Sequence, residues 1–297
     1  MRTLITGATG LLGAELVSRT PSPVVLTRAP DSAISKLGAV EAYPWQPQQT
    51  TPPPVALRGT DVVFNLAGEP VAGGRWTQEK KQLIRDSRIL TTRHLVEGLL
   101  AMEKRPKVLV SASAVGYYGD RGNADLDENA PAGDGFLSEV CREWESAACE
   151  AQKLGVRVVC VRFGIVLSSR GGALRRMLTP FKIGMGGRIG DGKQWVSWIH
   201  IRDAVGMLLH AAKEDSIRGP MNAVAPVPVT NGELTRSLAQ ALHRPAILQV
   251  PKAALSLAMG EMSRMLTDSQ RVVPQVALRS GYQFNFPDLD GALQDLV

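Results

Sequence analysis

Three glycines near the start of the chain constrain its fold more than any other feature. Gly7, Gly10 and Gly13 follow the apolar run Leu4-Ile5 and open a segment, 11–19, with the pattern of a helix. In a strand–turn–helix unit, the first glycine permits a tight turn, the second lets the backbone approach a phosphate, and the third allows close helix–strand packing. The spacing therefore predicts that a dinucleotide binds at this turn, through Gly7, Thr9, Gly10, Leu11 and Leu12.

Short apolar segments alternate with helical patterns through the first half of the chain. This alternation predicts an α/β fold, a Rossmann-type doubly wound parallel sheet with helices on both faces. We expect strands at 3–6, 24–27, 40–43, 62–65, 107–111 and 157–163, and helices at 11–19, 78–103 and 138–154. The proline-rich segment 44–54 is predicted to be a surface loop. A dinucleotide-binding domain, 1–165 with 198–215 returning to it, would carry a smaller C-terminal α/β substrate lobe formed by 166–197 and 216–297.

Composition limits the possible partners. The chain has 34 basic and 28 acidic residues, and its richest basic stretch (Lys80, Lys81, Arg85, Arg88 and Arg93) is broken by acidic residues. We interpret this stretch as a solvated helix face and expect no nucleic-acid partner. No apolar run reaches about 18 residues and no signal-peptide pattern opens the chain, so we expect no membrane span. The three cysteines lack metal-ligand spacing, which indicates reduced thiols, no bound metal and a cytoplasmic location.

Further motifs follow the glycine turn in a recognisable order. They are Asn65-Leu66-Ala67-Gly68, then Ser111 to Gly119, then Arg162-Phe163-Gly164, and finally Trp198 to Asp203. Over essentially its whole length the chain resembles the extended short-chain dehydrogenase/reductase superfamily, and more specifically its atypical branch of epimerase family proteins. The resemblance implies an NADP-dependent oxidoreductase or epimerase with its active site between two lobes. By analogy it also implies a homodimer through the helices at 78–103 and 138–154.

The end of the second predicted strand distinguishes between two nicotinamide cofactors. Proteins that bind NAD place a carboxylate there for the ribose 2′-hydroxyl, whereas this chain has Thr27 and Arg28. A guanidinium can pair with a 2′-phosphate, so we expect NADP(H), with Thr27 as an additional donor.

The turn after the fourth predicted strand is expected to line the cofactor. Leu66, Ala67 and Gly68 should line the path from the adenosine to the ribose, where small residues leave room. Glu69 and Arg75 follow, either as further cofactor contacts or as a surface ion pair.

The chain retains only part of the catalytic apparatus that the resemblance implies. The superfamily typically uses a Tyr-x-x-x-Lys pair, in which the lysine lowers the phenol pKa from about 10. The matching positions hold Gly135 and Glu139, so this dyad is absent. Ser113 matches the superfamily's serine, and it is either a substrate contact or a satisfied hydroxyl at a strand end.

Two tyrosines remain as candidates for proton transfer. Tyr117 and Tyr118 follow Ser113, and they either protonate a carbonyl after hydride delivery or pack as aromatic side chains. His200 is expected to be a buried histidine that joins the two lobes rather than a catalyst.

The glycine-rich stretch 184–193 has two interpretations. It is either a substrate lid in which Arg188 and Lys193 contact an anionic group, or a flexible surface connection; the nearby Trp195 and Trp198 favour the lid. Together the patterns predict an NADP(H)-dependent enzyme acting on a small polar carbonyl or hydroxyl substrate. The alternative is a catalytically silent NADP(H)-binding sensor or scaffold.

Overall fold

One parallel sheet forms the centre of the computed structural model, which describes residues 1–38 and 40–297. Its inner strands are buried on both faces, as their Val-, Leu- and Ile-rich sequences require when helices cover each side. All neighbouring strands are parallel. Their spatial order is β12 (Gly219–Ala223), β7 (Arg157–Phe163), β5 (Val108–Ala114), β4 (Val62–Asn65), β1 (Thr3–Thr6), β2 (Val24–Thr27) and β3 (Glu41–Pro44). The predicted α/β fold is confirmed.

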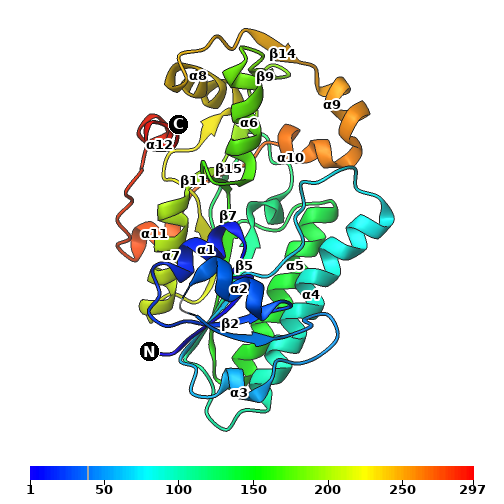
Figure 1. Cartoon of the computed structure of the whole chain (residues 1–297). Helices are drawn as coiled ribbons and strands as arrows, with labels where there is room; N and C mark the ends of the chain where they lie inside the picture. Colours follow the sequence, from blue (N-terminus) through cyan, green and yellow to red (C-terminus); the bar gives the residue numbers. More distant parts are fainter. Residues whose placement is uncertain (39) are drawn as a thin grey trace.

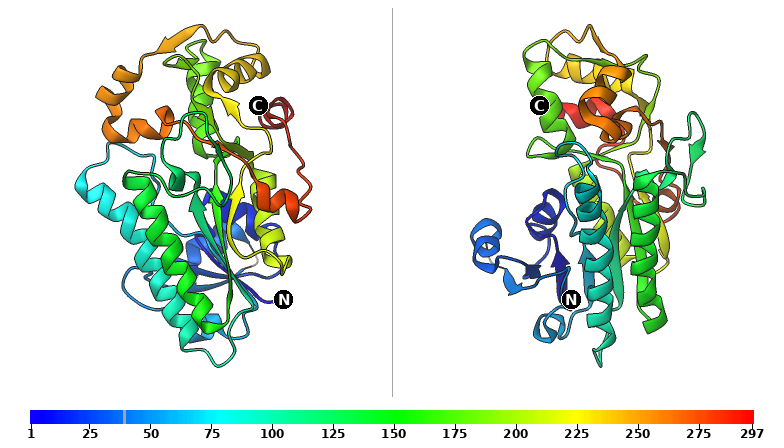
Figure 2. Two further views of the ribbon diagram at one scale, coloured as in Figure 1. Left: turned by 180° about the vertical axis from the view of Figure 1, so that it is seen from behind. Right: turned by 90° about the vertical axis from the view of Figure 1, so that its right-hand side faces the viewer.

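Helices cover both faces of this sheet (Figures 1 and 2). The long helices α4 (Gln78–Leu100) and α5 (Phe136–Cys149) lie side by side on one face, where the short α3 (Pro54–Leu57) also packs. On the other face α1 (Leu11–Val17) packs against α7 (Ile201–Lys213). α2 (Pro30–Leu37) borders β2 and β3.

The strand order reverses between β1 and β4, which creates a crevice at their carboxyl ends. Buried polar side chains fix this edge. Thr6 Oγ1 donates to Asn65 Oδ1 over 2.9 Å, and Asn65 Nδ2 donates to Ser111 Oγ over 3.2 Å. These bonds hold the ends of three central strands in register, next to the turns that carry the predicted cofactor residues.

The remaining elements form a smaller lobe beyond the carboxyl ends of the strands (Figure 1). Its core gathers buried residues such as Leu174, Trp198, Leu234 and Leu293. It contains four two-stranded ribbons, β6 (Asp125–Leu126) with β15 (Arg271–Val272), β8 (Ile165–Leu167) with β11 (Trp198–His200), β9 (Gly187–Ile189) with β14 (Leu248–Val250), and β10 (Trp195–Val196) with β13 (Val229–Thr230). Its helices are α6 (Gly172–Lys182), α8 (Asn231–Ala241), α9 (Lys252–Met259), α10 (Arg264–Thr267) and α12 (Leu289–Leu296), with a 3₁₀ turn, η3 (Gly260–Ser263).

Two segments placed in the lobe by the sequence analysis return to the sheet. β12 pairs with β7 and forms an edge of the central sheet, and α11 (Gln275–Arg279) packs against β12. The prediction that 216–297 belongs to the lobe is therefore wrong for β12 and α11. The burial of Met221, beside Val161 of β7, explains why the chain returns.

Element ends also differ from those predicted. The helix expected at 138–154 starts at Phe136 and becomes a 3₁₀ turn, η2 (Glu150–Leu154), after Cys149. The helix expected at 78–103 ends at Leu100, and β5 continues to Ala114, which places Ser113 inside the strand. The predicted surface loop 44–54 buries Trp45, whose indole donates to the carbonyl of Thr50 over 2.8 Å. Within the described residues, no helix is both long and apolar enough to cross a membrane.

Candidate functional site

The glycine turn after β1 has no room for side chains. Gly7 has a φ of 68°, and a Cβ there would lie 2.6 Å from the carbonyl oxygen of Leu66. A Cβ on Gly13 would collide with the carbonyl of Gly7. Gly10 precedes α1 and caps it with no side chain, which leaves the start of the helix open. This arrangement fits a pyrophosphate that approaches the backbone closely.

Arg28 and Thr27 stand at the carboxyl end of β2, next to β1 in the sheet. Arg28 is exposed, and it forms no ion pair with any described residue. Thr27 Oγ1 accepts a hydrogen bond from the amide of Ala29 over 3.3 Å. The guanidinium is therefore available at the strand end where the adenosine ribose of a dinucleotide is recognised.

The turn after β4 is anchored to β1. The amides of Leu66 and Ala67 donate to Thr6 Oγ1 over 3.1 and 3.2 Å. This holds the turn directly against Gly7, so a single continuous wall of backbone lines the crevice.

Glu69 and Arg75 do not form the ion pair that was one of their two interpretations. Glu69 pairs with Lys80 over 2.7 Å. Arg75 donates instead to the carbonyls of Leu257 and Ala258 at the end of α9, the second bond measuring 3.0 Å. Arg75 therefore connects the turn after β4 to the C-terminal lobe.

The basic stretch of α4 was expected to be one solvated helix face, but it is not uniformly solvated. Lys81 pairs with Glu261 of the lobe. Arg88 turns inward against Gly68 and lies 5.2 Å from the Trp144 ring. Sequence reasoning missed Arg88 because one residue of an exposed-looking helix face gives no sign of its direction.

Ser113 belongs to a buried polar cluster rather than standing free. Its hydroxyl donates to Glu145 Oε1 over 2.6 Å. Arg162, the partner of Ser113 in the β5–β7 register, holds both oxygens of Glu145 through bonds of 2.8 Å. Ser113 is therefore held by a buried ion pair between Arg162 and Glu145.

Tyr118 is part of the same interior cluster. Its side chain is fully buried, and its hydroxyl donates to Asn222 Oδ1 over 2.7 Å while accepting from Arg162 Nη1 over 2.9 Å. Burial raises the pKa of Tyr118 to about 12, although Arg162 opposes this shift. Because the Tyr118 hydroxyl already donates to Asn222 in the interior, we interpret Tyr118 as a structural residue.

Tyr117 occupies a different position. Its ring stacks on the guanidinium of Arg162 at 3.5 Å and meets the Tyr118 ring edge to face. Unlike Tyr118 it is only partly buried, and no bond from its hydroxyl to a described residue is found. Ser113 and Tyr117 therefore both lie against Arg162, and the Tyr117 hydroxyl is positioned to bind a ligand.

Gly135 and Glu139, at the positions expected for the Tyr-x-x-x-Lys pair, lie at the start of α5. Gly135 precedes α5 with a φ of 97°, and Arg264 lies beside it. Glu139 lies on the outer side of α5, where it lines a cavity of about 350 Å³ with Lys81 and Arg85.

His200 joins two parts of the molecule. It is buried, its Nδ1 accepts from the amide of Arg202 at the start of α7, and its Nε2 lies 3.2 Å from Asp295 of α12. The ring stacks on Phe286 at 3.8 Å, and burial lowers its pKa. This is the structural position expected for it.

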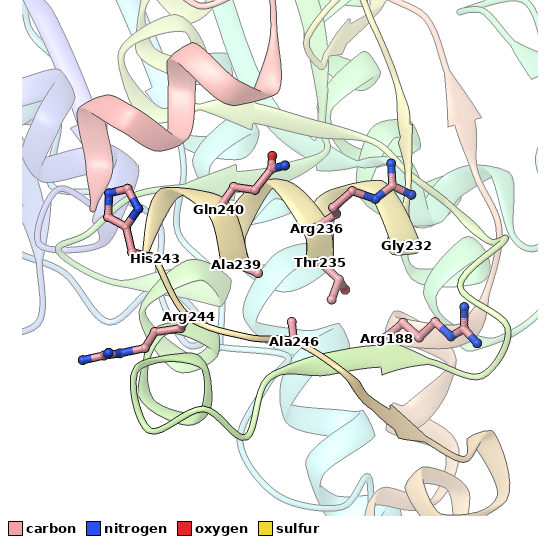
Figure 3. Close-up of a pocket in the computed structure, with 9 residues that line it drawn as sticks. All are labelled: Arg188, Gly232, Thr235, Arg236, Ala239, Gln240, His243, Arg244 and Ala246. Carbon is pink, nitrogen blue, oxygen red and sulfur yellow. The ribbon is translucent and has the colours of Figure 1, made fainter.

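The glycine-rich stretch 184–193 is not a free connection, because Gly187–Ile189 forms β9 and pairs with β14. Trp198 is buried in the lobe core, while Trp195 stacks with Arg271. A groove of about 700 Å³ lies between α8 and the segment leading to β14. Figure 3 shows the side chains that line it. Its lining includes Arg188, Arg236, His243 and Arg244 around Thr235, Ala239 and Ala246. Arg188 thus faces this groove of the lobe.

Comparisons with known proteins agree with this geometry. Residues 3–223 match the model of the NAD dependent epimerase/dehydratase family, and residues 250–296 match a domain of unknown function, DUF1731. The chain is 39% identical over 295 residues to epimerase family protein Mb2239 of Mycobacterium bovis, covering 97% of this chain and 95% of that protein. It is 39% identical over 303 residues to the chloroplastic SDR39U1 homolog of Arabidopsis thaliana, covering 100% and 87%.

A solved structure shows the same likeness. Human epimerase family protein SDR39U1 (isoform 2), crystallised with NADPH, superposes with a TM-score of 0.88 at 33% identity, over 100% of this chain and 99% of that one. The match spans both the sheet and the lobe. The glycine turn, the parallel sheet and these matches together show that the chain belongs to the NAD dependent epimerase/dehydratase family.

Proposed function

We propose that the chain binds NADP(H) and uses it to reduce a small polar carbonyl substrate, or to oxidise the corresponding hydroxyl. The observation that carries the cofactor assignment is Arg28 at the end of β2, where a carboxylate would select NAD. The glycine turn fits a dinucleotide because Cβ atoms on Gly7 or Gly13 would fill its place. The human relative crystallised with NADPH supports the same assignment.

Binding NADPH would supply the hydride for reduction. The residues of this chain would position the substrate and donate a proton to it. Tyr117 Oη is the group we propose to donate its proton to the developing alkoxide, because Arg162 stacks on its ring and fixes its direction. Ser113, with its own proton bound to Glu145, presents an oxygen that accepts a hydrogen bond from a substrate hydroxyl. Tyr118 is left out of this assignment because its proton is held in the interior.

The cofactor assignment is tested by calorimetric titration of NADPH and NADH against the wild type and Arg28→Ala. We expect the wild type to prefer NADPH and Arg28→Ala to lose most of that preference. The exposed Arg58, which precedes β4 at the opposite edge of the sheet, provides the control Arg58→Ala with the same change of charge. Equal binding of NADH and NADPH by the wild type would contradict the assignment.

The chemical step is tested by following NADPH oxidation with a panel of aldehydes, ketones and quinones. We expect turnover that falls by roughly 10²-fold or more in Tyr117→Phe, which keeps the ring on Arg162 but removes the proton. Tight NADPH binding without turnover across the panel would instead favour a sensor or scaffold, the alternative that the missing dyad supports.

We further propose a cytoplasmic location and a homodimer. All three cysteines are free thiols, and two of them are buried, which suits a reducing compartment. α4 exposes the large apolar side chain of Leu83, which could contact a second copy of the chain. Light scattering of the wild type and Leu83→Glu tests the dimer, since a charge at the contact would favour the monomer.

A further inference from the structure

A groove on the C-terminal lobe lies apart from the crevice that the glycine turn borders. It runs between α8 and the segment leading to β14, and none of its described lining residues belongs to the turns after β1, β2 or β4. Thr235 and Ala239 point from α8 towards Ala246 across it (Figure 3). Because these three side chains are small, a volume of about 700 Å³ stays free between the two walls.

The end of α8 builds one basic end of the groove. The Arg244 amide donates to the carbonyl of Ala239 over 3.0 Å, which closes the helix. His243 has a φ of 51°, in the left-handed region where glycine is usual after a helix. This turn sends the chain back along α8 as the second wall, and it places an imidazole and a guanidinium at the same end of the groove (Figure 3).

Two arginines mark the opposite end of the groove (Figure 3). A Cβ on Gly192 would lie 3.4 Å from Arg188 Cδ and 3.2 Å from the Cα of Gly232, so the arm of Arg188 lies beside the first turn of α8. Arg236 follows Gly232 by one helical turn. The run from Gly232 to His243 is about 16 Å long at the rise of a helix, so the two basic ends are separated by about that length.

The guanidinium groups at both ends lack carboxylate partners among the described residues. Arg188, Arg236 and Arg244 are exposed, and none of them forms an ion pair or donates a side-chain hydrogen bond to a residue that the structure describes. Glu233, the carboxylate of α8, accepts instead from the amide and hydroxyl of Thr230, over 2.7 and 2.8 Å. The two ends of the groove are therefore positive and suit an occupant with negative charge at both of its ends.

The middle of the groove offers different chemistry. The Thr235 hydroxyl is buried and has no hydrogen-bond partner in the described part of the chain. Buried polar groups are rarely left in this state, so a bound acceptor is indicated. Next to Ala246, the apolar side chain of Ile247 is largely exposed. A matching occupant therefore brings a hydrogen-bond acceptor and small apolar groups to the middle.

We propose that this groove docks an extended acidic segment of a partner protein, with carboxylates at both ends and small apolar side chains between them. An extended chain covers about 16 Å in about five residues, whereas a single phosphate or carboxylate ion reaches only one end. The carboxylates of the segment pair with Arg188 and Arg236 at one end. At the other end they bind Arg244 and the His243 ring, and a backbone carbonyl between them accepts from Thr235. Each exposed ion pair contributes little alone, so binding depends on both ends and weakens with salt.

Fluorescence anisotropy of three labelled nine-residue peptides tests this docking on the whole chain. The first peptide has two glutamates at each end and five alanines and valines between them. The second has lysines in place of the glutamates, and the third has the residues of the first with the glutamates in the middle. We expect the first peptide to bind roughly tenfold more tightly than the others and to lose affinity as salt rises. Its binding should weaken roughly tenfold in Arg188→Glu and in Arg244→Glu. Arg218→Glu is the matched control, because Arg218 is exposed and precedes β12 in the central sheet.

His243→Gly separates docking from folding. Glycine relieves the φ of 51° but removes the imidazole, so the melting temperature should stay or rise while the first peptide binds more weakly. The proposal is overturned if the wild type does not distinguish the three peptides, or if Arg188→Glu, Arg244→Glu or His243→Gly binds the first peptide like the wild type. It is also overturned if no peptide binds and light scattering shows that Arg188→Glu changes the oligomeric state, since the occupant would then be a second copy of this chain.

Discussion

The Ser113 hydroxyl donates a 2.6 Å hydrogen bond to Glu145 Oε1, the oxygen that also accepts from Arg162 Nε. A serine in this state can only accept from a substrate. In the proposed reaction Ser113 therefore contacts a hydroxyl of the substrate, whereas the carbonyl lies at Tyr117. The Ser113 hydroxyl group donates its hydrogen bond to Glu145, and Arg162 balances the negative charge of Glu145.

This cluster predicts unequal effects of two substitutions. Glu145→Gln leaves the buried Arg162 without its anion, so we expect about 3 kcal/mol or more of lost stability. Ser113→Ala removes one hydrogen bond to a carboxylate that keeps Arg162, and should cost about 1–2 kcal/mol. Urea unfolding of both variants and of the double variant measures the difference. Equal losses from the two single variants would show that Arg162 does not depend on Glu145.

The sequence was sufficient for those parts of the molecule that depend on local pattern. The glycine spacing and the buried β-branched strands predicted β1, β2, β4 and β7 with the bounds observed, because a short continuous apolar run bounded by turn residues is typical of a strand buried on both faces. The return of β12 to the sheet was missed, since pairing with β7 is a long-range contact that no local pattern carries.

The site was predictable only in its backbone. Gly7 and Gly13 are recognisable because glycine is required wherever a Cβ would collide. The directions of side chains were not predictable: Arg88 turns towards Gly68, Arg75 reaches α9, and Tyr118 enters the core while its neighbour Tyr117 does not. Such choices depend on which partners tertiary packing brings near, and these are far apart in sequence.

Burial of Tyr118 predicts a dependence of stability on alkaline pH. Its pKa is about 12 in the folded protein and about 10 in an unfolded chain, so the folded state favours the protonated phenol. The stabilisation is complete below pH 10 and is lost as pH rises through about 12, by on the order of 2 kcal/mol. We expect Tyr118→Phe to lose less stability than the wild type between about pH 9 and about pH 11. Urea midpoints at the two pH values measure this, and a pH dependence identical in both proteins would contradict it.

The glycine turn predicts that Gly7→Ala loses both stability and cofactor affinity. The alanine would combine a φ of 68° with a Cβ 2.6 Å from the Leu66 carbonyl oxygen. Gly155 is the matched control, because its φ is 79° but its Cβ would meet open space. Gly155→Ala should therefore cost about 1 kcal/mol and leave NADPH binding intact. Calorimetry and urea unfolding separate the two effects, and a Gly7→Ala protein that binds NADPH normally would show that the turn is not the cofactor site.

Among substitutions outside the crevice, we expect Asp203→Asn to cause the largest loss of stability. This buried carboxylate in the first turn of α7 accepts from the Tyr282 hydroxyl, the Asn285 amide and side chain, and the Phe286 amide, over 2.8 to 3.1 Å. It thereby fastens the segment after α11 to the sheet domain. Asp203→Asn replaces an acceptor-only group with one that must present a donor to some of these partners, so we expect a loss of about 3 kcal/mol or more.

The matched control is Asp215→Asn, since the side chain of Asp215 is 96% exposed although it lies 3.5 Å from Arg157. Removing that charge should change stability by less than about 0.5 kcal/mol. Hydrogen exchange adds a local readout, because the amides of Asn285 and Phe286 should lose protection in Asp203→Asn and keep it in Asp215→Asn. If those two amides stay protected in Asp203→Asn, the carboxylate does not hold this segment, and the hydrophobic contacts of Tyr282 and Phe284 with the sheet core hold it instead.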